Sequence, residues 1–258
     1  MSSHDMIPDP QDMFEHLKST LDEVPDRLGT VNSDLRTPLE QIQFTLQNFV
    51  RNSDDPDNWE LDISPNWRFE IEDSRDFEKS EGQAVIGGHI VVEDGEYKQY
   101  SFNLSILQRD NQPGSGMLEK EVNGALCCPV DHSEKWTMVR RFHFDIDSGG
   151  GPHESKPVCH LQTGGNISDG HGISKDFHYC RTELDKPRIQ YPPMDLVLVL
   201  DMLLDQYVNL ANNRDKHWKS LVFKSEKVLW APYYSKFGSR YLGSSDPPKP
   251  AREMIKNH

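Results

Sequence analysis

The sequence predicts an α+β fold, with an antiparallel sheet of five or six strands flanked by N-terminal helices and by a long apolar helix near residues 194–212. Three observations predict it. Apolar residues recur at helical spacing in the first 52 residues, every second residue is apolar along much of 59–165, and helical spacing returns after residue 193. Helices, then strands, then helices are typical of an α+β domain.

The N-terminal part, residues 9–52, is predicted to form two helices. In the first, Met13, Leu17 and Leu21 fall on one face. The second begins at a capping box over residues 37–40, with proline at the first helical position. Its apolar face is then formed by Leu39, Ile42, Leu46, Phe49 and Val50.

The sheet is predicted over residues 59–165. Alternation of apolar and polar residues marks a half-buried strand at 67–72. The dipeptide Asp94-Gly95 predicts a tight hairpin between strands at 84–93 and 97–108. Segments 136–147 and 157–163 complete the expected strands.

The helix near 194–212 is apolar over more than half of its surface, so we expect it in the core. A segment rich in basic and aromatic residues follows it, and the core helix and this segment together span 193–243. These parts predict one domain over residues 1–243, followed by a flexible tail at 244–258.

The charge of the chain is uneven. The net charge is −14, but residues 214–258 hold ten Lys and Arg against four Asp and Glu. An acidic body repels a phosphate backbone, so nucleic acid is expected to bind only through the basic tail 214–258, if at all. We expect a cytoplasmic protein without a membrane segment, because no export signal opens the sequence and its longest apolar run, 196–204, is too short to cross a bilayer.

The candidate site lies on the predicted strands 136–147 and 157–163. In the first, Arg141, His143, Asp145 and Asp147 share one face, opposite a face with Phe142 and Phe144. In one antiparallel register, His143 and Asp145 neighbour His160 and Gln162 of the second strand. Histidine and aspartate bind divalent metals and move protons, so His143, Asp145, Asp147 and His160 are candidate metal ligands.

Two other interpretations of these residues stay open. The charged face is also what a solvent-exposed sheet surface looks like, with Arg141 paired to Asp145. A zinc site could instead join the segments 127–132 and 178–180, although the adjacent Cys127 and Cys128 lack the usual spacing of structural zinc ligands.

The segments Arg141–Asp147, His160–Gly165 and Pro187–Ile189 resemble a pattern in prokaryotic accessory and defence-locus protein families without an assigned activity. The resemblance covers roughly residues 136–208. It adds Arg188 to the candidate catalytic residues His143, Asp145 and His160, and it implies no reaction.

Two functions are compatible with the sequence. The first is a non-enzymatic binding or regulatory protein with a protein partner, as in a prokaryotic toxin–antitoxin or defence system; the acidity and the lack of a recognised catalytic motif favour it. The alternative is a metal-dependent hydrolase acting on a phosphodiester or nucleotide, with the His and Asp face as its site.

Overall fold

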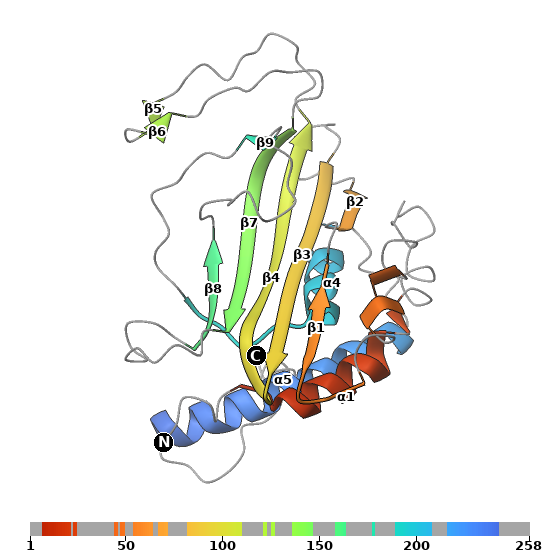
Figure 1. Cartoon of the computed structure of the whole chain (residues 1–258). Coiled ribbons are helices and arrows are strands. Elements are labelled where there is room, and N and C mark those ends of the chain that lie inside the picture. Colours follow the sequence, from red (N-terminus) through yellow and green to blue (C-terminus); the bar gives the residue numbers. More distant parts are fainter. Residues whose placement is uncertain are drawn as a thin grey trace.

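A computed structural model gives the fold of the chain (Figure 1). The residues that the structure describes are 7–21, 23–24, 44–45, 47–49, 54–63, 67–71, 82–109, 121–122, 125–126, 136–146, 158–163, 177–178, 189–207 and 216–242.

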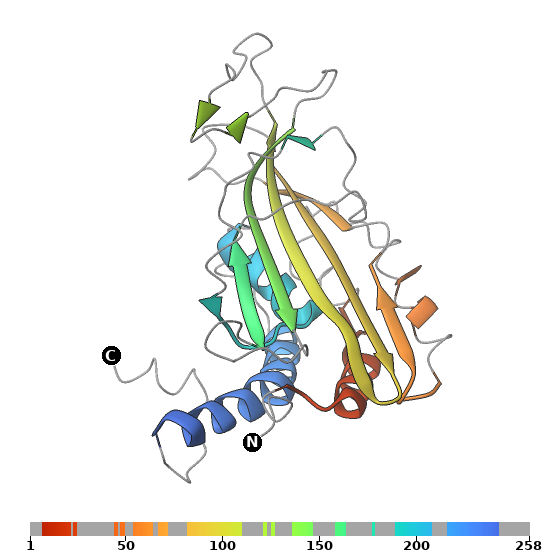
Figure 2. The ribbon, with the colours of Figure 1, turned by 60° about the vertical axis from the view of Figure 1, so that its left-hand side comes forward.

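The fold is α+β, and its centre is a mostly antiparallel sheet of eight strands. The main path across the sheet is β1 (Trp59–Asp62), β3 (Gly82–Glu93), β4 (Glu96–Arg109), β7 (Trp136–Ile146), β8 (Cys159–Thr163) and β10 (Ile189–Gln190). Figure 2 shows the twist of the long strands β3, β4 and β7.

Four shorter strands complete the sheet structure. β2 (Trp67–Ile71) pairs with β3 in line with β1, and β9 (Phe177–His178) pairs with β7 in parallel. A separate pair is formed by β5 (Glu121–Val122) and β6 (Ala125–Leu126). The prediction of five or six strands was too low because β9 and β10 have two residues each, which is too short to show an alternation.

The hairpin between β3 and β4 turns at Asp94-Gly95, as predicted. Both residues have positive φ, 52° and 70°, which is the backbone of a type I′ turn. Gly88 is also required by the packing, because a Cβ there would lie 2.4 Å from the ring of Phe102 on the neighbouring strand.

Three helices cover one face of the sheet: α1 (Pro10–Leu21), α4 (Leu196–Gln206) and α5 (Lys216–Leu242). In Figure 1, α4 lies behind the strands, and α1 and α5 lie at the end that holds the β3–β4 turn. They enclose the core, which includes Leu17, Phe102, Phe144, Leu200 and Leu229.

The predicted helix near 194–212 is shorter than expected. Asp195 caps α4, its side chain accepting a hydrogen bond from Leu198 N at 2.9 Å, and the helix has eleven residues. Tyr207 follows as a C-cap with non-helical φ of −124°, so the backbone leaves the helix there. Residues 208–215 lie outside the described residues, as do 243–258, so the predicted tail is still a prediction.

The basic aromatic segment is one helix, α5, with Pro232 inside it. Its buried face repeats at helical spacing, a pattern that is present in the sequence. The buried residues are Trp218, Leu221, Val222, Ser225, Leu229 and Tyr233. Of the second predicted N-terminal helix, only residues 44–45 and 47–49 are described, and these are helical.

No helix among the described residues is long and apolar enough to cross a membrane.

Candidate functional site

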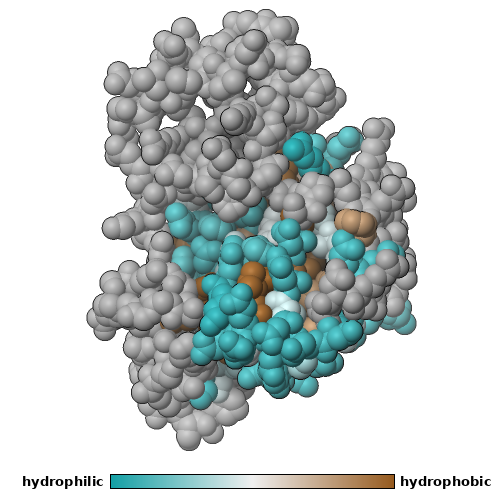
Figure 3. All heavy atoms as spheres, viewed as in Figure 1, coloured by the Kyte–Doolittle hydropathy of each residue, from teal (hydrophilic) through white to brown (hydrophobic). Residues whose placement is uncertain are grey.

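The second face of the sheet, opposite the three helices, is polar over its central strands. Directly paired residues of antiparallel strands share a face, so the register aligns Ser101 with Asp145 and His160, and Asn103 with His143 and Gln162. We call this the polar face. Hydrophilic side chains predominate where Figure 3 exposes described residues on this side of the molecule.

The predicted alternation of β7 is confirmed. Phe144 and Ile146 are buried toward the helices and Phe142 packs against the same core. Arg141, His143 and Asp145 occupy the opposite, polar face, in register with Ser105, Asn103 and Ser101.

Asp145 joins the two histidines of the predicted site. Its Oδ1 lies 3.2 Å from His143 Nε2, and its Oδ2 lies 3.6 Å from His160 Nε2. His143 Nε2 also lies 3.2 Å from the hydroxyl oxygen of Ser101. The predicted register, with His160 and Gln162 beside Asp145 and His143, is therefore correct. We call His143, Asp145 and His160 the polar-face cluster.

The polar face is more buried than a solvated sheet surface. Arg141 and His160 are 5% and 3% exposed, so the interpretation of this face as an exposed, charged surface is wrong at these two positions. On the neighbouring strand, Asn103 is 3% exposed and Ser105 is fully buried.

Two of these buried groups have no hydrogen-bond partner in the described part of the chain: Asn103 Oδ1 and the Ser105 hydroxyl. Buried polar atoms in folded proteins are nearly always bonded, so each unbonded one needs an explanation. Ser101, Asn103 and Ser105 are not among the predicted site residues. Their signal was the polar residue at every second position of 100–106.

The proposed metal ligands are only partly placed. Asp147 and Arg188 lie outside the described residues. Among the residues that are described, no group of three or more His, Cys, Asp and Glu side chains is arranged to hold a metal ion. A divalent metal at this site remains a prediction.

The proposed zinc site cannot be examined, because Cys127, Cys128 and Cys180 lie outside the described residues. Cys159 is described and is a buried free thiol beneath the sheet, on the side of the helices. Burial raises the pKa of this thiol far above its usual range. It is therefore protonated at neutral pH and a poor nucleophile.

A second histidine–aspartate pair lies between the helices, and no local sequence pattern predicts it. His16 of α1 places Nε2 at 2.8 Å from Asp195 Oδ2 and at 3.1 Å from the Ser225 hydroxyl of α5. We call these three residues the helix-side network. All three are buried.

The helix-side network does not have the geometry of a catalytic triad, although it contains Ser, His and Asp. In a triad the aspartate binds one ring nitrogen of the histidine and the serine binds the other. Here both partners contact the same nitrogen, Nε2. The network therefore ties α1 to α4 and α5 instead of activating the serine.

Comparison with known proteins gives no family for this chain: no family model, no curated protein and no solved structure matches it.

Proposed function

We propose that this chain is a non-enzymatic binding or regulatory protein that recognises a partner protein through the polar face of its sheet. One observation carries the proposal: Asn103 Oδ1 and the Ser105 hydroxyl are buried and unbonded within the described part of the chain, on the strand next to the polar-face cluster. An unbonded buried polar group costs about 1–3 kcal/mol. Both groups are enclosed in the free chain, so a partner can supply these hydrogen bonds only after β4 is uncovered; the part-exposed His143 and Asp145 of the same face are the groups that it contacts first.

The chemistry of the face supports a polar partner surface. Asn103 Oδ1 accepts hydrogen bonds and the Ser105 hydroxyl both donates and accepts. The Arg141 guanidinium lies in register with Ser105, so the face also offers a cation. The specific role that we propose is that of a partner in a prokaryotic toxin–antitoxin or defence system, in line with the resemblance of residues 141–147, 160–165 and 187–189 to such families.

The test separates binding from folding. Wild-type protein and Ser105→Ala are immobilised and exposed to lysate of the source organism. A protein that wild type enriches over a blank support is then purified, whether or not Ser105→Ala also enriches it, and its dissociation constants for wild type, Ser105→Ala and His160→Ala are measured by calorimetry. We expect Ser105→Ala and His160→Ala to weaken binding by about tenfold or more, equivalent to about 1.4 kcal/mol, with little change in melting temperature. Equal affinity for wild type and both variants would contradict the proposal.

A metal-dependent hydrolase is the second candidate, and the contact of one carboxylate with two histidines favours it. In that case His143, Asp145 and His160, with Arg188, supply acid–base and charge-stabilising groups. Metal analysis of purified protein and hydrolysis of bis(p-nitrophenyl) phosphate decide between the two functions. Stoichiometric metal that is lost in His160→Ala, together with turnover, would replace the binding proposal by this one.

A further inference from the structure

One edge of strand β1 has no paired strand among the described residues. In the described part of the chain, β1 pairs with β3 alone. Ile63 N donates to Gly88 O at 2.9 Å, which makes this position a hydrogen-bonded pair. In an antiparallel ladder such pairs alternate, so Trp59 and Leu61 bond to β3 while the N–H and C=O groups of Glu60 and Asp62 point outward.

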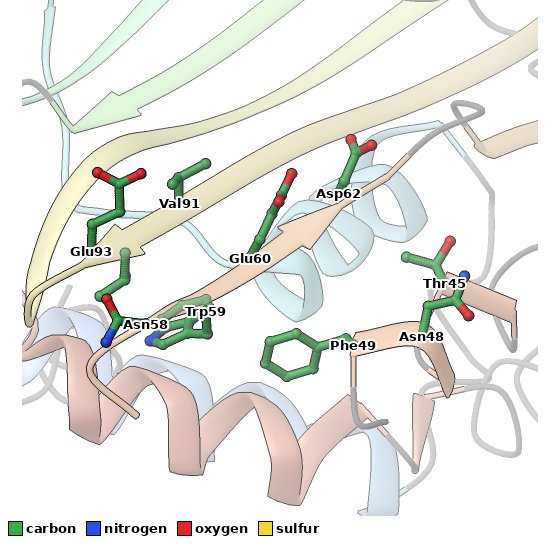
Figure 4. Close-up of a pocket in the computed structure, with 10 residues that line it drawn as sticks. Thr45, Asn48, Phe49, Asn58, Trp59, Glu60, Asp62, Val91 and Glu93 are labelled. Carbon is green, nitrogen blue, oxygen red and sulfur yellow. The ribbon is translucent and has the colours of Figure 1, made fainter. Parts of the chain in front are cut away.

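A groove of about 480 Å³ runs along this edge (Figure 4). One wall is β1 with the end of β3, and the other is formed by Thr45, Asn48 and Phe49 of the helical residues at 44–49. The outward backbone groups of Glu60 and Asp62 border a space of sufficient volume for a short peptide segment.

The two sides of the groove differ in chemistry. Figure 4 shows the carboxylates of Glu60, Asp62 and Glu93 on one side of the strand, and the rings of Trp59 and Phe49 on the other. All three carboxylates belong to exposed residues, and Glu60 also holds His89 at 2.8 Å. The two rings are 5.7 Å apart in a T-shaped contact.

A strand added to β1 would place alternate side chains on these two sides. Its first set would meet carboxylates, which favour Lys and Arg. Its second set would lie on the side of Trp59 and Phe49, which are 4% and 3% exposed, so no charge there opposes or attracts these side chains. The edge therefore selects for an extended segment in which basic and uncharged residues alternate.

We propose that β1 docks an extended segment of a partner protein, with Lys or Arg at alternate positions and uncharged residues between them, by strand addition at Glu60 and Asp62. This surface lies at the sheet edge and is independent of the polar-face cluster. Charged, short edge strands can also serve to prevent pairing. The two roles can be told apart by experiment. If the edge docks a strand, binding requires hydrogen bonds from the backbone of the incoming chain; if the edge is protected, no such bonds form.

The direct test is fluorescence anisotropy of the full-length protein with short labelled peptides. A peptide that alternates lysine and valine is compared with one of the same composition in which the lysines form a block. We expect the alternating peptide to bind at least about tenfold more tightly. Two N-methylated forms of the alternating peptide, each blocking the N–H groups of one edge, test strand addition directly. One methylated form should lose binding and the other should keep it. The proposal is overturned if the two methylated forms bind equally, or if the alternating and the block peptide bind equally.

Variants of the groove supply the second test. Glu60→Gln combined with Asp62→Asn should weaken binding of the alternating peptide by about tenfold. The control, Glu15→Gln combined with Asp205→Asn, removes the same charge from exposed sites on helices α1 and α4. It should change the affinity by less than about twofold. Similar losses in both double variants would show general attraction to an acidic protein and overturn the proposal.

Two further outcomes are distinguishable. His160→Ala should bind the alternating peptide like wild type, because the polar-face cluster is not part of the groove; a failed polar-face proposal would thus leave this one intact. If sedimentation shows that the chain self-associates, and the alternating peptide dissolves the oligomer, the occupant is a second copy and the proposal of a different partner is wrong.

Discussion

The two histidine–aspartate clusters of this protein lie on opposite faces of one sheet and differ in how completely their surroundings are bonded. In the helix-side network, His16 contacts both Asp195 and Ser225, and Asp195 also caps α4. Beside the polar-face cluster, Asn103 Oδ1 and the Ser105 hydroxyl remain without a partner in the described part of the chain. Complete bonding is typical of a structural network, whereas each unbonded buried group requires an explanation, and we propose a partner as that explanation here.

The largest effect should come from breaking the helix-side network. His16→Ala removes the partner of a fully buried carboxylate, and we expect a loss of about 3–5 kcal/mol in the free energy of unfolding. His143→Ala, the same chemical change at a part-buried position of the polar-face cluster, should cost about 1 kcal/mol. Urea denaturation of both variants measures the difference, and equal losses would remove the distinction between the clusters.

Packing on the helix side should be almost as sensitive. Leu203 is fully buried in α4, so Leu203→Ala should destabilise the fold by about 2–5 kcal/mol. Asp205, two residues later and exposed, provides the control, because Asp205→Ala should change the urea midpoint only slightly. An unchanged midpoint for Leu203→Ala would place α4 outside the cooperative core.

A bonded hydroxyl on the polar face should have a modest effect. Ser101 Oγ contacts His143 Nε2 at 3.2 Å, so Ser101→Ala should cost about 1 kcal/mol. The loss should be reproduced in chemical and thermal denaturation. A cost above about 3 kcal/mol would indicate that the polar-face cluster is structural as well.

The smallest effect on stability is expected at Ser105. Ser105→Ala removes a buried hydroxyl that has no partner among the described residues, so the free energy of unfolding should be unchanged or slightly higher. Partner binding should nevertheless fall. A clear destabilisation by Ser105→Ala would mean that the hydroxyl is bonded within the fold, and the main support for the binding proposal would be lost.

The local patterns predicted most of the sheet. Asp94-Gly95 placed the β3–β4 hairpin, and alternation in β7 placed His143 and Asp145 opposite Phe142 and Phe144. Both are properties of neighbouring residues, which a single sequence displays directly.

Contacts between distant segments were not predictable in this way. His16 and Asp195 are 179 positions apart, and no periodicity relates them. The burial of Asn103 and Ser105 likewise depends on what surrounds β4 in space, whereas their polarity alone suggested exposure. The candidate site was therefore located by sequence, but the unbonded groups that support its role were not.

The helix-side network also has a consequence for the order of events during synthesis. The β3–β4 hairpin joins residues close in the sequence and can form as soon as both strands have emerged from the ribosome. Helix α1 emerges earlier, yet the partners of His16 lie in α4 and α5, 179 and 209 positions later. His16 therefore stays without these partners until Ser225 has been made, although Phe14 of the same helix can pack earlier on Phe49 and Trp59. The contacts that tie α1 to α4 and α5 should thus form after the β3–β4 hairpin.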